Sequence, residues 1–294
     1  MIAPVETRHI TLGDLDVAYL TTGPEDGVIA LLLHGYPDTP WSWRHLAPVL
    51  ADRGYRVVAP FLRGYAPTGL APDGCYQTGA LVADAIALRR AVGDHRPALL
   101  VGHDWGAITA YGAAVHAPAL WDRVVTMAVP PLGTAARLRD PLLVGKQLSA
   151  SWYMGFQLLP WLSEWALPRL IPRLWADWSP GFDAREDVAR VLEALPDEAH
   201  RTAALRYYRS WARPWRKLPR YRREERAVFG LPPQPLLYLF GADDGCVRPE
   251  ASRLAAALCP TVEVPGAGHF LAVERPDAVA SAVEAFLDQQ SLDR

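Results

Sequence analysis

One carboxylate stands where a sharp turn between a strand and a helix would expose it. The sequence Gly102-His-Asp-Trp-Gly106 follows a short apolar run and precedes a helix-like segment. Small residues on both sides of Asp104 suit a nucleophile elbow, a strained turn that raises one side chain above a sheet. The raised residue is commonly serine, yet no Gly-x-Ser-x-Gly occurs in the chain. An aspartate could also cap the following helix, but the small residues around it favour the elbow.

The carboxylate at this position decides the chemistry that we expect. Attack by a carboxylate on a carbonyl would give an activated anhydride, which makes Asp104 poorly suited to ester exchange. Displacement at a saturated carbon would instead form an ordinary alkyl ester on the enzyme. The sequence therefore predicts a nucleophile that acts on saturated carbon.

A nucleophile of this kind needs donors for an oxyanion. His34-Gly-Tyr-Pro37 follows the first long apolar run. Because the amides after that strand and after the nucleophile face one point in such an elbow, we expect the N–H groups of Tyr36 and Trp105 to form the oxyanion hole. A simple turn at the end of a strand is the alternative reading of this Gly-Pro segment.

The base and its acid partner should come late in the chain, in the order nucleophile, acid, histidine. His269 lies in Gly266-Ala-Gly-His-Phe270, directly after the last apolar run, and is the predicted base. Two candidates for the acid, Asp243 and Asp244, follow another apolar run. Either could be the acid, although Asp243 also suits a turn beside Gly245.

The segments that must position these residues alternate between strand and helix. The first 20 residues predict an antiparallel hairpin that turns at Gly13-Asp14. Continuous apolar runs, typical of strands buried on both faces, then alternate with helical patterns. The expected strands are 28–33, 56–61, 98–101, 124–129, 235–240 and 261–264, and the expected helices 41–52, 81–92, 107–116, 249–258 and 277–287. This alternation of strands and helices predicts an α/β fold with a mostly parallel, doubly wound sheet.

The alternation of strands and helices stops in the middle of the chain. Residues 131–231 are rich in tryptophan and proline and show helical periodicity without buried strand runs. We expect a helical lid inserted into one core made of residues 1–130 and 232–294. The alternative is a second folded domain. The alternation of strands and helices resumes after residue 231, which argues against that alternative. The arginine-rich stretch 213–226 is either a solvated face paired with Glu224 and Glu225 or a surface for an acidic ligand or partner.

Together these motifs resemble the epoxide hydrolase branch of the α/β-hydrolase fold. The resemblance rests on five segments in the expected order: His34–Pro37, Arg63-Gly-Tyr65, Gly102–Ala107, Gly241–Asp244 and Gly268-His-Phe270 with Glu274-Arg-Pro276. Its Gly-x-x-Asp spacing favours Asp244 over Asp243 as the acid that orients His269. It also implies that two lid tyrosines bind the epoxide oxygen. Tyr153 is the first, and Tyr208 the second with Tyr207 as the alternative, although tyrosines could also simply fill the interface between lid and core. Ala66-Pro-Thr68 departs from the family pattern.

The resemblance also implies hydrolysis of an apolar epoxide to a vicinal diol, through an alkyl ester on Asp104 that water, activated by His269, then cleaves. The expected substrate contacts are His34, Pro37, Trp105, Trp152 and Phe270, and neither a metal nor a cofactor is implied. A haloalkane or haloacid dehalogenase would use the same nucleophile. However, haloalkane dehalogenases usually have asparagine at the position of Tyr36. Fluoroacetate dehalogenases usually have arginine at the position of Trp105. A binding protein without catalysis is a further alternative.

Composition narrows the cellular setting. The 294 residues have a formal net charge of −2, which gives no general case for nucleic-acid binding. Cys75, Cys246 and Cys259 show no metal-ligand spacing, and three scattered cysteines suggest a reducing compartment. The first residues hold no apolar run of signal length, and no window suits a spanning helix. We therefore expect a cytoplasmic monomer or homodimer that does not bind membranes.

Overall fold

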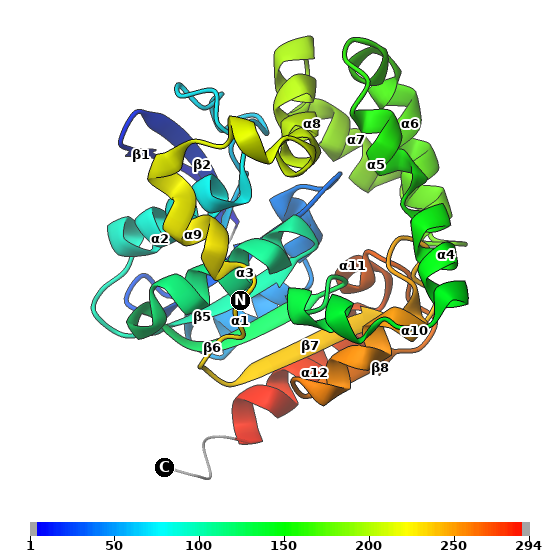
Figure 1. The fold of residues 1–294 in the computed structure, drawn as a ribbon. Helices are drawn as coiled ribbons and strands as arrows, with labels where there is room; N and C mark the ends of the chain where they lie inside the picture. The colour runs from blue at the N-terminus through cyan, green and yellow to red at the C-terminus, as the bar shows by residue number, and fades with distance from the viewer. Residues whose placement is uncertain (1–4, 290–294) are drawn as a thin grey trace.

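The computed structural model describes residues 5–289. A sheet runs through the centre of the molecule (Figure 1). Within this range eight strands lie in the order β1-β2-β4-β3-β5-β6-β7-β8. The first hairpin pairs antiparallel with itself and with β4, and all later pairings are parallel. The strands are β1 (Glu6–Leu12), β2 (Leu15–Thr22), β3 (Val28–Leu33), β4 (Tyr55–Pro60), β5 (Ala98–His103), β6 (Trp121–Met127), β7 (Leu236–Gly241) and β8 (Thr261–Val264).

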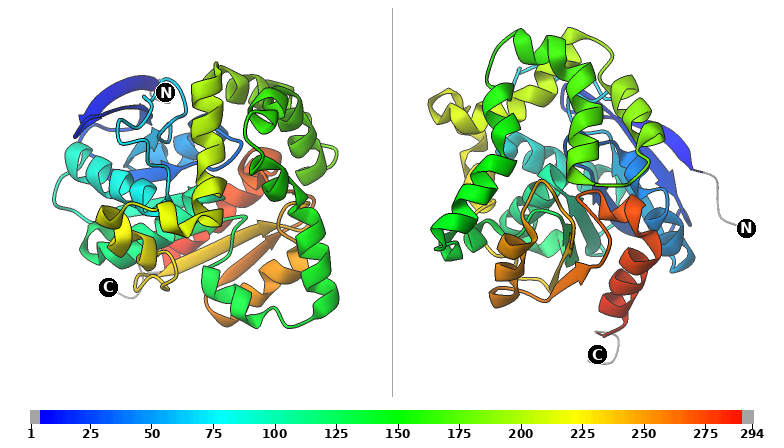
Figure 2. Two further views of the ribbon diagram at one scale, coloured as in Figure 1. Left: turned by 45° about the horizontal axis from the view of Figure 1, so that its top comes forward. Right: turned by 90° about the vertical axis from the view of Figure 1, so that its right-hand side faces the viewer.

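Helices cover both faces of this sheet. On one face α1 (Leu46–Asp52) packs against α12 (Pro276–Gln289), and on the other α2 (Thr78–Val92) packs against α3 (Trp105–His116), as the side view in Figure 2 shows. The central strands are buried along their whole length, as parallel strands covered on two sides must be. The prediction of a mostly parallel, doubly wound sheet is confirmed.

The strand register brings the chemical motifs to one edge. Leu33 of β3 pairs with Gly102 of β5, so the turn after β3 and the elbow after β5 are neighbours. Gly241 of β7 pairs with Val264 of β8, which brings together the segments that carry Asp244 and His269. The carboxyl ends of parallel strands form the edge at which α/β folds bind ligands.

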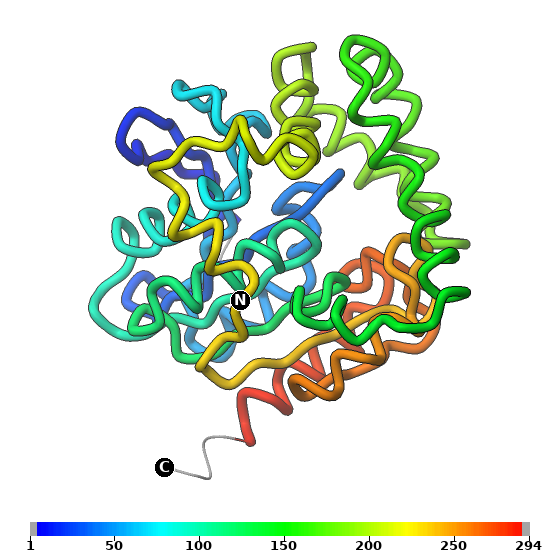
Figure 3. The backbone as a smooth tube through the Cα atoms, viewed as in Figure 1, coloured from blue at the N-terminus to red at the C-terminus, as the bar shows by residue number. Residues whose placement is uncertain are grey.

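A helical insertion between β6 and β7 covers this edge (Figures 1 and 3). It begins with η3 (Leu132–Arg137) and contains α4 (Pro141–Ala150), α5 (Trp152–Gln157), α6 (Leu162–Trp178), α7 (Arg185–Ala194), α8 (Glu198–Ala212), η4 (Pro214–Arg216) and η5 (Pro219–Tyr221). The next helix, α9 (Arg222–Ala227), packs against α2 and α3 of the core. We therefore propose that the lid, expected over 131–231, ends before Arg222.

Most expected elements agree with the structure to within a few residues, and two expected helices are each divided. The expected helix 41–52 is divided into η1 (Pro40–Trp43) and α1, and 249–258 becomes α10 (Pro249–Ser252) followed by η6 (Arg253–Ala257). The short helices η2 (Pro118–Leu120) and α11 (Leu271–Glu274) were not expected, since three or four residues carry no periodic signal. Between residues 5 and 289, no helix combines the length and the apolar character that a bilayer crossing requires.

Candidate active site

Asp104 occupies a strained turn between β5 and α3. Its backbone has φ 52° and ψ −116°, a region that residues other than glycine rarely adopt. The flanking glycines are required by close backbone approach. A Cβ on Gly102 would lie 2.3 Å from the Gly106 carbonyl oxygen, and one on Gly106 would lie 2.0 Å from that of Leu33. The turn therefore has the geometry of a nucleophile elbow.

The two carboxylate oxygens of Asp104 have different neighbours. The Tyr36 N–H donates a hydrogen bond to Oδ1 over 2.7 Å. The Trp105 N–H, at the first position of α3, has no hydrogen-bond partner among the described residues. These two amides are the expected oxyanion donors, and Oδ1 already lies beside one of them. Oδ2 is turned toward His269, at 3.7 Å from its Nε2 atom.

His269 and Asp244 form a buried pair next to the nucleophile. The Nδ1 atom of His269 lies 3.0 Å from Oδ2 of Asp244, and both side chains are fully buried. Oδ1 of Asp244 accepts hydrogen bonds from the amides of Cys246 and Val247, which fix the carboxylate. Asp243, the alternative acid, is exposed. The structure thus brings together Asp104, His269 and Asp244, in the arrangement of nucleophile, base and orienting acid.

The charges around His269 determine its protonation. Burial alone would lower its pKa, but the carboxylates of Asp244 and Asp104 outweigh burial and raise the pKa to about 10. The imidazole is therefore protonated near neutral pH while Asp104 is ionised. It can act as a base only when one of these negative charges is removed.

The end of lid helix α6 holds the two catalytic loops in place. The carbonyl oxygen of Trp178 accepts the N–H of His269 over 3.0 Å and that of Gly245 over 3.1 Å. Gly268 is needed for this approach, because a Cβ there would lie 2.5 Å from the same carbonyl oxygen. Glu274 completes the contact by accepting from the Ser179 hydroxyl and the Gly268 amide. The lid is therefore part of the framework of the site.

Two of the three candidate tyrosines face each other next to the elbow. The ring centroids of Tyr153 and Tyr208 lie 5.8 Å apart, edge to face, and Tyr208 also packs on Tyr36 and Trp105 at 5.1 Å each. The Tyr208 hydroxyl is buried without a partner among the described residues. Tyr207 differs, because its hydroxyl donates to the Arg63 carbonyl oxygen over 2.8 Å. This geometry favours Tyr208 over Tyr207 as the second lid tyrosine.

Burial keeps both phenols protonated. It raises the pKa of Tyr153 and of Tyr208 well above the usual value of 10, and the negative charge of Asp104 acts in the same direction on each. Two neutral O–H groups within the field of the nucleophile can donate hydrogen bonds to a developing oxyanion. They cannot act as bases near neutral pH.

Two polar neighbours were missed by sequence reasoning. The thiol of Cys246 lies 3.5 Å from the Tyr153 hydroxyl. The amide of Gln157 donates to the Tyr36 hydroxyl over 2.7 Å, and its own buried Oε1 atom has no partner in the described chain. The place of Cys246, two residues after Asp244, is the one signal that could have indicated it.

The residues expected to contact substrate have varied places. Trp105 is buried at the elbow, with its ring edge to face against Tyr208. The ring of Phe270 is stacked on that of Trp175, with the two ring centroids 3.4 Å apart, and it also packs beside the ring of His269. The carbonyl of Pro37 accepts a hydrogen bond from the Trp175 indole. These three residues border the catalytic groups, and direct contact with substrate stays a prediction for each.

The places of His34 and Trp152 do not support the expected substrate contacts. His34 uses both ring nitrogens, since Nε2 accepts the Leu62 N–H over 3.0 Å and Nδ1 lies 2.9 Å from the Gly35 carbonyl oxygen. Burial lowers its pKa to about 4, so it is neutral and holds the turn after β3. The Trp152 side chain is 44% exposed and lies under the guanidinium of Arg173 on the outer side of the lid. Sequence spacing could not show which way these rings point.

Comparison with known proteins agrees with this geometry. Residues 30–282 match the model of the alpha/beta hydrolase family. The chain is 26% identical to the AB hydrolase superfamily protein YfhM of Bacillus subtilis, over 97% of this chain and 99% of that protein. It is 27% identical to Epoxide hydrolase A of Mycobacterium tuberculosis, over 98% of each chain.

Solved structures give the same result. A crystal structure from Klebsiella pneumoniae, provisionally named an epoxide hydrolase, superposes with a TM-score of 0.80 at 28% identity and covers 96% of this chain and 97% of its own. Epoxide Hydrolase A from Mycobacterium thermoresistibile shares the fold, with a TM-score of 0.75 at 24% identity over 97% and 98% of the two chains. The chain belongs to the alpha/beta hydrolase family, whose model matches residues 30–282.

Proposed function

We propose that this hydrolase converts an epoxide to a vicinal diol through a covalent ester on Asp104. The observation that carries the proposal is the pairing of a carboxylate nucleophile with two neutral, buried tyrosines. An epoxide oxygen needs hydrogen-bond donors as the ring opens, whereas a departing halide needs no proton. The 27% identical Epoxide hydrolase A supports the same assignment.

In the first step Oδ2 of Asp104 attacks a ring carbon and the bond from that carbon to oxygen breaks. Oδ2 is the attacking atom because Oδ1 is held by the Tyr36 amide. The hydroxyls of Tyr153 and Tyr208 donate to the ring oxygen, which takes up one proton. In the overall balance this proton is the one that His269 loses, because esterification removes a negative charge that kept its pKa high, and both tyrosines end the step protonated.

In the second step neutral His269, oriented by Asp244, takes a proton from water. The resulting hydroxide attacks the carbonyl carbon of the ester, and the negative charge develops on Oδ1, beside the N–H groups of Tyr36 and Trp105. Collapse of this intermediate breaks the bond from the carbonyl carbon to Oδ2. The diol leaves with the oxygen that was Oδ2, and the protonated His269 and ionised Asp104 of the resting enzyme are restored.

A single turnover in ¹⁸O-labelled water tests the covalent step. With enzyme in excess over styrene oxide, the first diol should contain no label and the peptide carrying Asp104 should gain one ¹⁸O. Asp104→Asn should abolish diol formation, while the matched variant Asp243→Asn, at the exposed neighbour of the acid, should keep it. Label in the first diol would mean direct attack by water and would contradict the ester. A parallel assay with a chloroalkane should release no chloride.

A further inference from the structure

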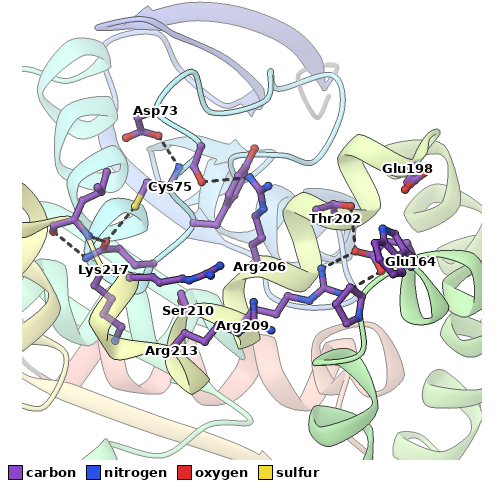
Figure 4. Close-up of a pocket in the computed structure, with 17 residues that line it drawn as sticks. Asp73, Cys75, Glu164, Glu198, Thr202, Arg206, Arg209, Ser210, Arg213 and Lys217 are labelled. Carbon is purple, nitrogen blue, oxygen red and sulfur yellow. Dashed lines mark hydrogen bonds and ion pairs between the residues drawn. The ribbon is translucent and has the colours of Figure 1, made fainter.

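A cavity separate from the catalytic residues lies between the lid and the core. It has a volume of about 540 Å³ and is bordered by helix α8, the loop 73–77, the lid turn Pro160-Trp161 and the linker 213–218 (Figure 4). Neither Asp104 nor His269 nor Tyr208 lines it. Cavities of roughly 300–1,000 Å³ are typical of small-molecule sites. The cavity is therefore large enough to hold a ligand other than the substrate.

Helix α8 separates this cavity from the catalytic tyrosines. Thr202, Arg206, Arg209 and Arg213 recur at spacings of three or four residues and line the cavity. Tyr207, Tyr208 and Trp211 occupy the opposite face of the helix, where they pack against Trp105. The 3.6-residue period of the helix accounts for this division. One face serves the reaction, and the other presents arginines to the cavity.

Some charges at the cavity wall are neutralised by neighbours. Arg209 forms a buried ion pair with Glu164 at 2.6 Å. Lys217 is paired with Glu225, outside the cavity. Asp73 is paired with Arg220 and lies 3.7 Å from Arg63, also outside. None of these groups needs a ligand for charge balance.

Three cations at the wall lack a carboxylate partner among the described residues: Arg206, Arg213 and Arg216. The guanidinium of Arg206 lies over the ring of Tyr76 and donates a long hydrogen bond of 3.4 Å to the Gly74 carbonyl oxygen. The one remaining acid of the lining, Glu198, is 15 residues from Arg213, which is roughly 22 Å along a helix axis. The excess positive charge is thus concentrated at the end of α8 and in the linker.

Buried arginines elsewhere are held by carboxylates or, like Arg89, by backbone carbonyls, whereas Arg206 and Arg216 are exposed and Arg213 is half-buried at the cavity rim. Arg44 binds Asp187 at 2.5 Å and Arg63 binds Asp84 at 2.6 Å. The negative end of the α8 dipole favours a cation in its last turn. That effect accounts for Arg213 but not for Arg206, nearly two turns earlier, or Arg216, beyond the helix. Three unpaired guanidinium groups around one cavity instead match a ligand with several negative charges.

We propose that this cavity binds a small molecule carrying two or more negative charges, as phosphate or carboxylate groups. Guanidinium groups bind both anions through paired hydrogen bonds. Arg206 would hold the ligand from α8, and Arg213 and Arg216 from the linker. The site is independent of the substrate, because the catalytic groups lie on the other side of α8.

Calorimetric titration of the full chain with pyrophosphate and with citrate, at constant ionic strength, tests the proposal. Saturable binding of one molecule per chain is expected for at least one probe. The double variant Arg213→Gln/Arg216→Gln should weaken binding by about tenfold or more, since it removes two charged hydrogen-bond donors. The control Arg222→Gln/Arg223→Gln removes equal charge from exposed positions of α9 that do not line the cavity and should bind as the wild type does.

Three outcomes would overturn the proposal. The first is the absence of saturable binding of either probe up to millimolar concentration. The second is an equal loss in the α9 control, which would mean general charge attraction. The third is loss of binding in Asp104→Asn, which would place the probe at the catalytic centre. The melting temperature of each variant shows that it is folded, and styrene oxide turnover tests the proposed function separately.

Discussion

The Nε2 atom of His269 lies 3.7 Å from Oδ2 of Asp104, so the base and the nucleophile form an ion pair in the resting enzyme. This relationship explains how one histidine could serve both steps of the proposed reaction. Before the reaction its charge stabilises the carboxylate. In the proposed reaction, esterification would neutralise that carboxylate, lower the pKa of His269 and make the imidazole available as a base. The charges of the site thus support the order of the two proposed steps.

Replacing His269 by glutamine should trap the ester. Water would no longer be activated, and loss of a general base typically costs about 10²–10⁴-fold in rate. Intact-mass measurement after mixing with styrene oxide should show an increase equal to one epoxide, and diol formation should fall by about 10³-fold. His95→Gln, at an exposed position, is the matched control and should turn over normally. An inactive variant without an adduct would mean that His269 is required for the first step.

The raised pKa of His269 also predicts a dependence of stability on pH. Its folded pKa of about 10 lies above the ordinary value of 6.5. The stabilisation is therefore fully present below pH 6.5 and is lost as the pH rises through 10. Chemical denaturation should show the unfolding free energy of the wild type falling over this range more steeply than that of His269→Gln. Parallel curves for the two proteins would contradict the ion pair.

Adjacent tyrosines of α8 offer a matched pair of variants. Tyr208→Phe removes a hydroxyl that has no other partner in the described chain, and the rate of ester formation should fall by about 10²-fold. Tyr207→Phe removes the hydrogen bond to the Arg63 carbonyl, which should lower the unfolding free energy by about 1 kcal/mol and leave the rate unchanged. Rapid-quench kinetics and denaturation distinguish the two effects. The reverse result would assign the epoxide oxygen to Tyr207.

Cys246 should act as a positioning residue for Tyr153. Burial raises the pKa of its thiol well above the usual value, so the group is neutral, 3.5 Å from the phenol. Cys246→Ala should lower kcat several-fold with little change in KM, whereas Cys246→Ser keeps a hydrogen-bonding group and should restore most of kcat. If alanine and serine lower kcat equally, the thiol serves only to fill space.

The sequence carried enough information to predict the sheet and the elbow. Buried parallel strands are continuous apolar runs, and the elbow is encoded within five consecutive residues around Asp104. Both are local signals. Because the carboxyl ends of parallel strands lie at one edge of the sheet, the order of the strands was enough to place Asp104, His269 and the acid at that edge. No contact between them had to be known.

Choices between neighbours, and long-range contacts, could not be made this way. Asp243 and Asp244 differ in which side of a turn they face, and Tyr207 and Tyr208 differ by 100° around a helix. Cys246 meets Tyr153 across 93 residues of chain, and this contact depends on how the lid packs on the core. Only the folded arrangement determines such pairs.

The buried ion pair of Arg209 and Glu164 should control the stability of the lid at low pH. The pair joins α8 to α6, with the carboxylate held at 2.6 Å and 3.0 Å by two guanidinium nitrogens. Burial would raise the pKa of Glu164, but the hydrogen bonds from Arg209 outweigh it and lower the pKa to about 2, from 4.5. The stabilisation is therefore present above pH 4.5 and is lost as the pH falls through 2.

Glu164→Gln leaves a buried cation without its counter-charge, which should cost about 3 kcal/mol of unfolding free energy at pH 7. The difference from the wild type should shrink at pH 3, because the unfolded chain then protonates Glu164 while the folded protein still keeps it ionised. Glu193→Gln, at an exposed position of α7, should change little at either pH. The double variant Arg209→Met/Glu164→Met removes both charges together and should be more stable than Glu164→Gln, because no unpaired ion remains. A double variant less stable than the single one would mean that the pair contributes more than it costs to bury.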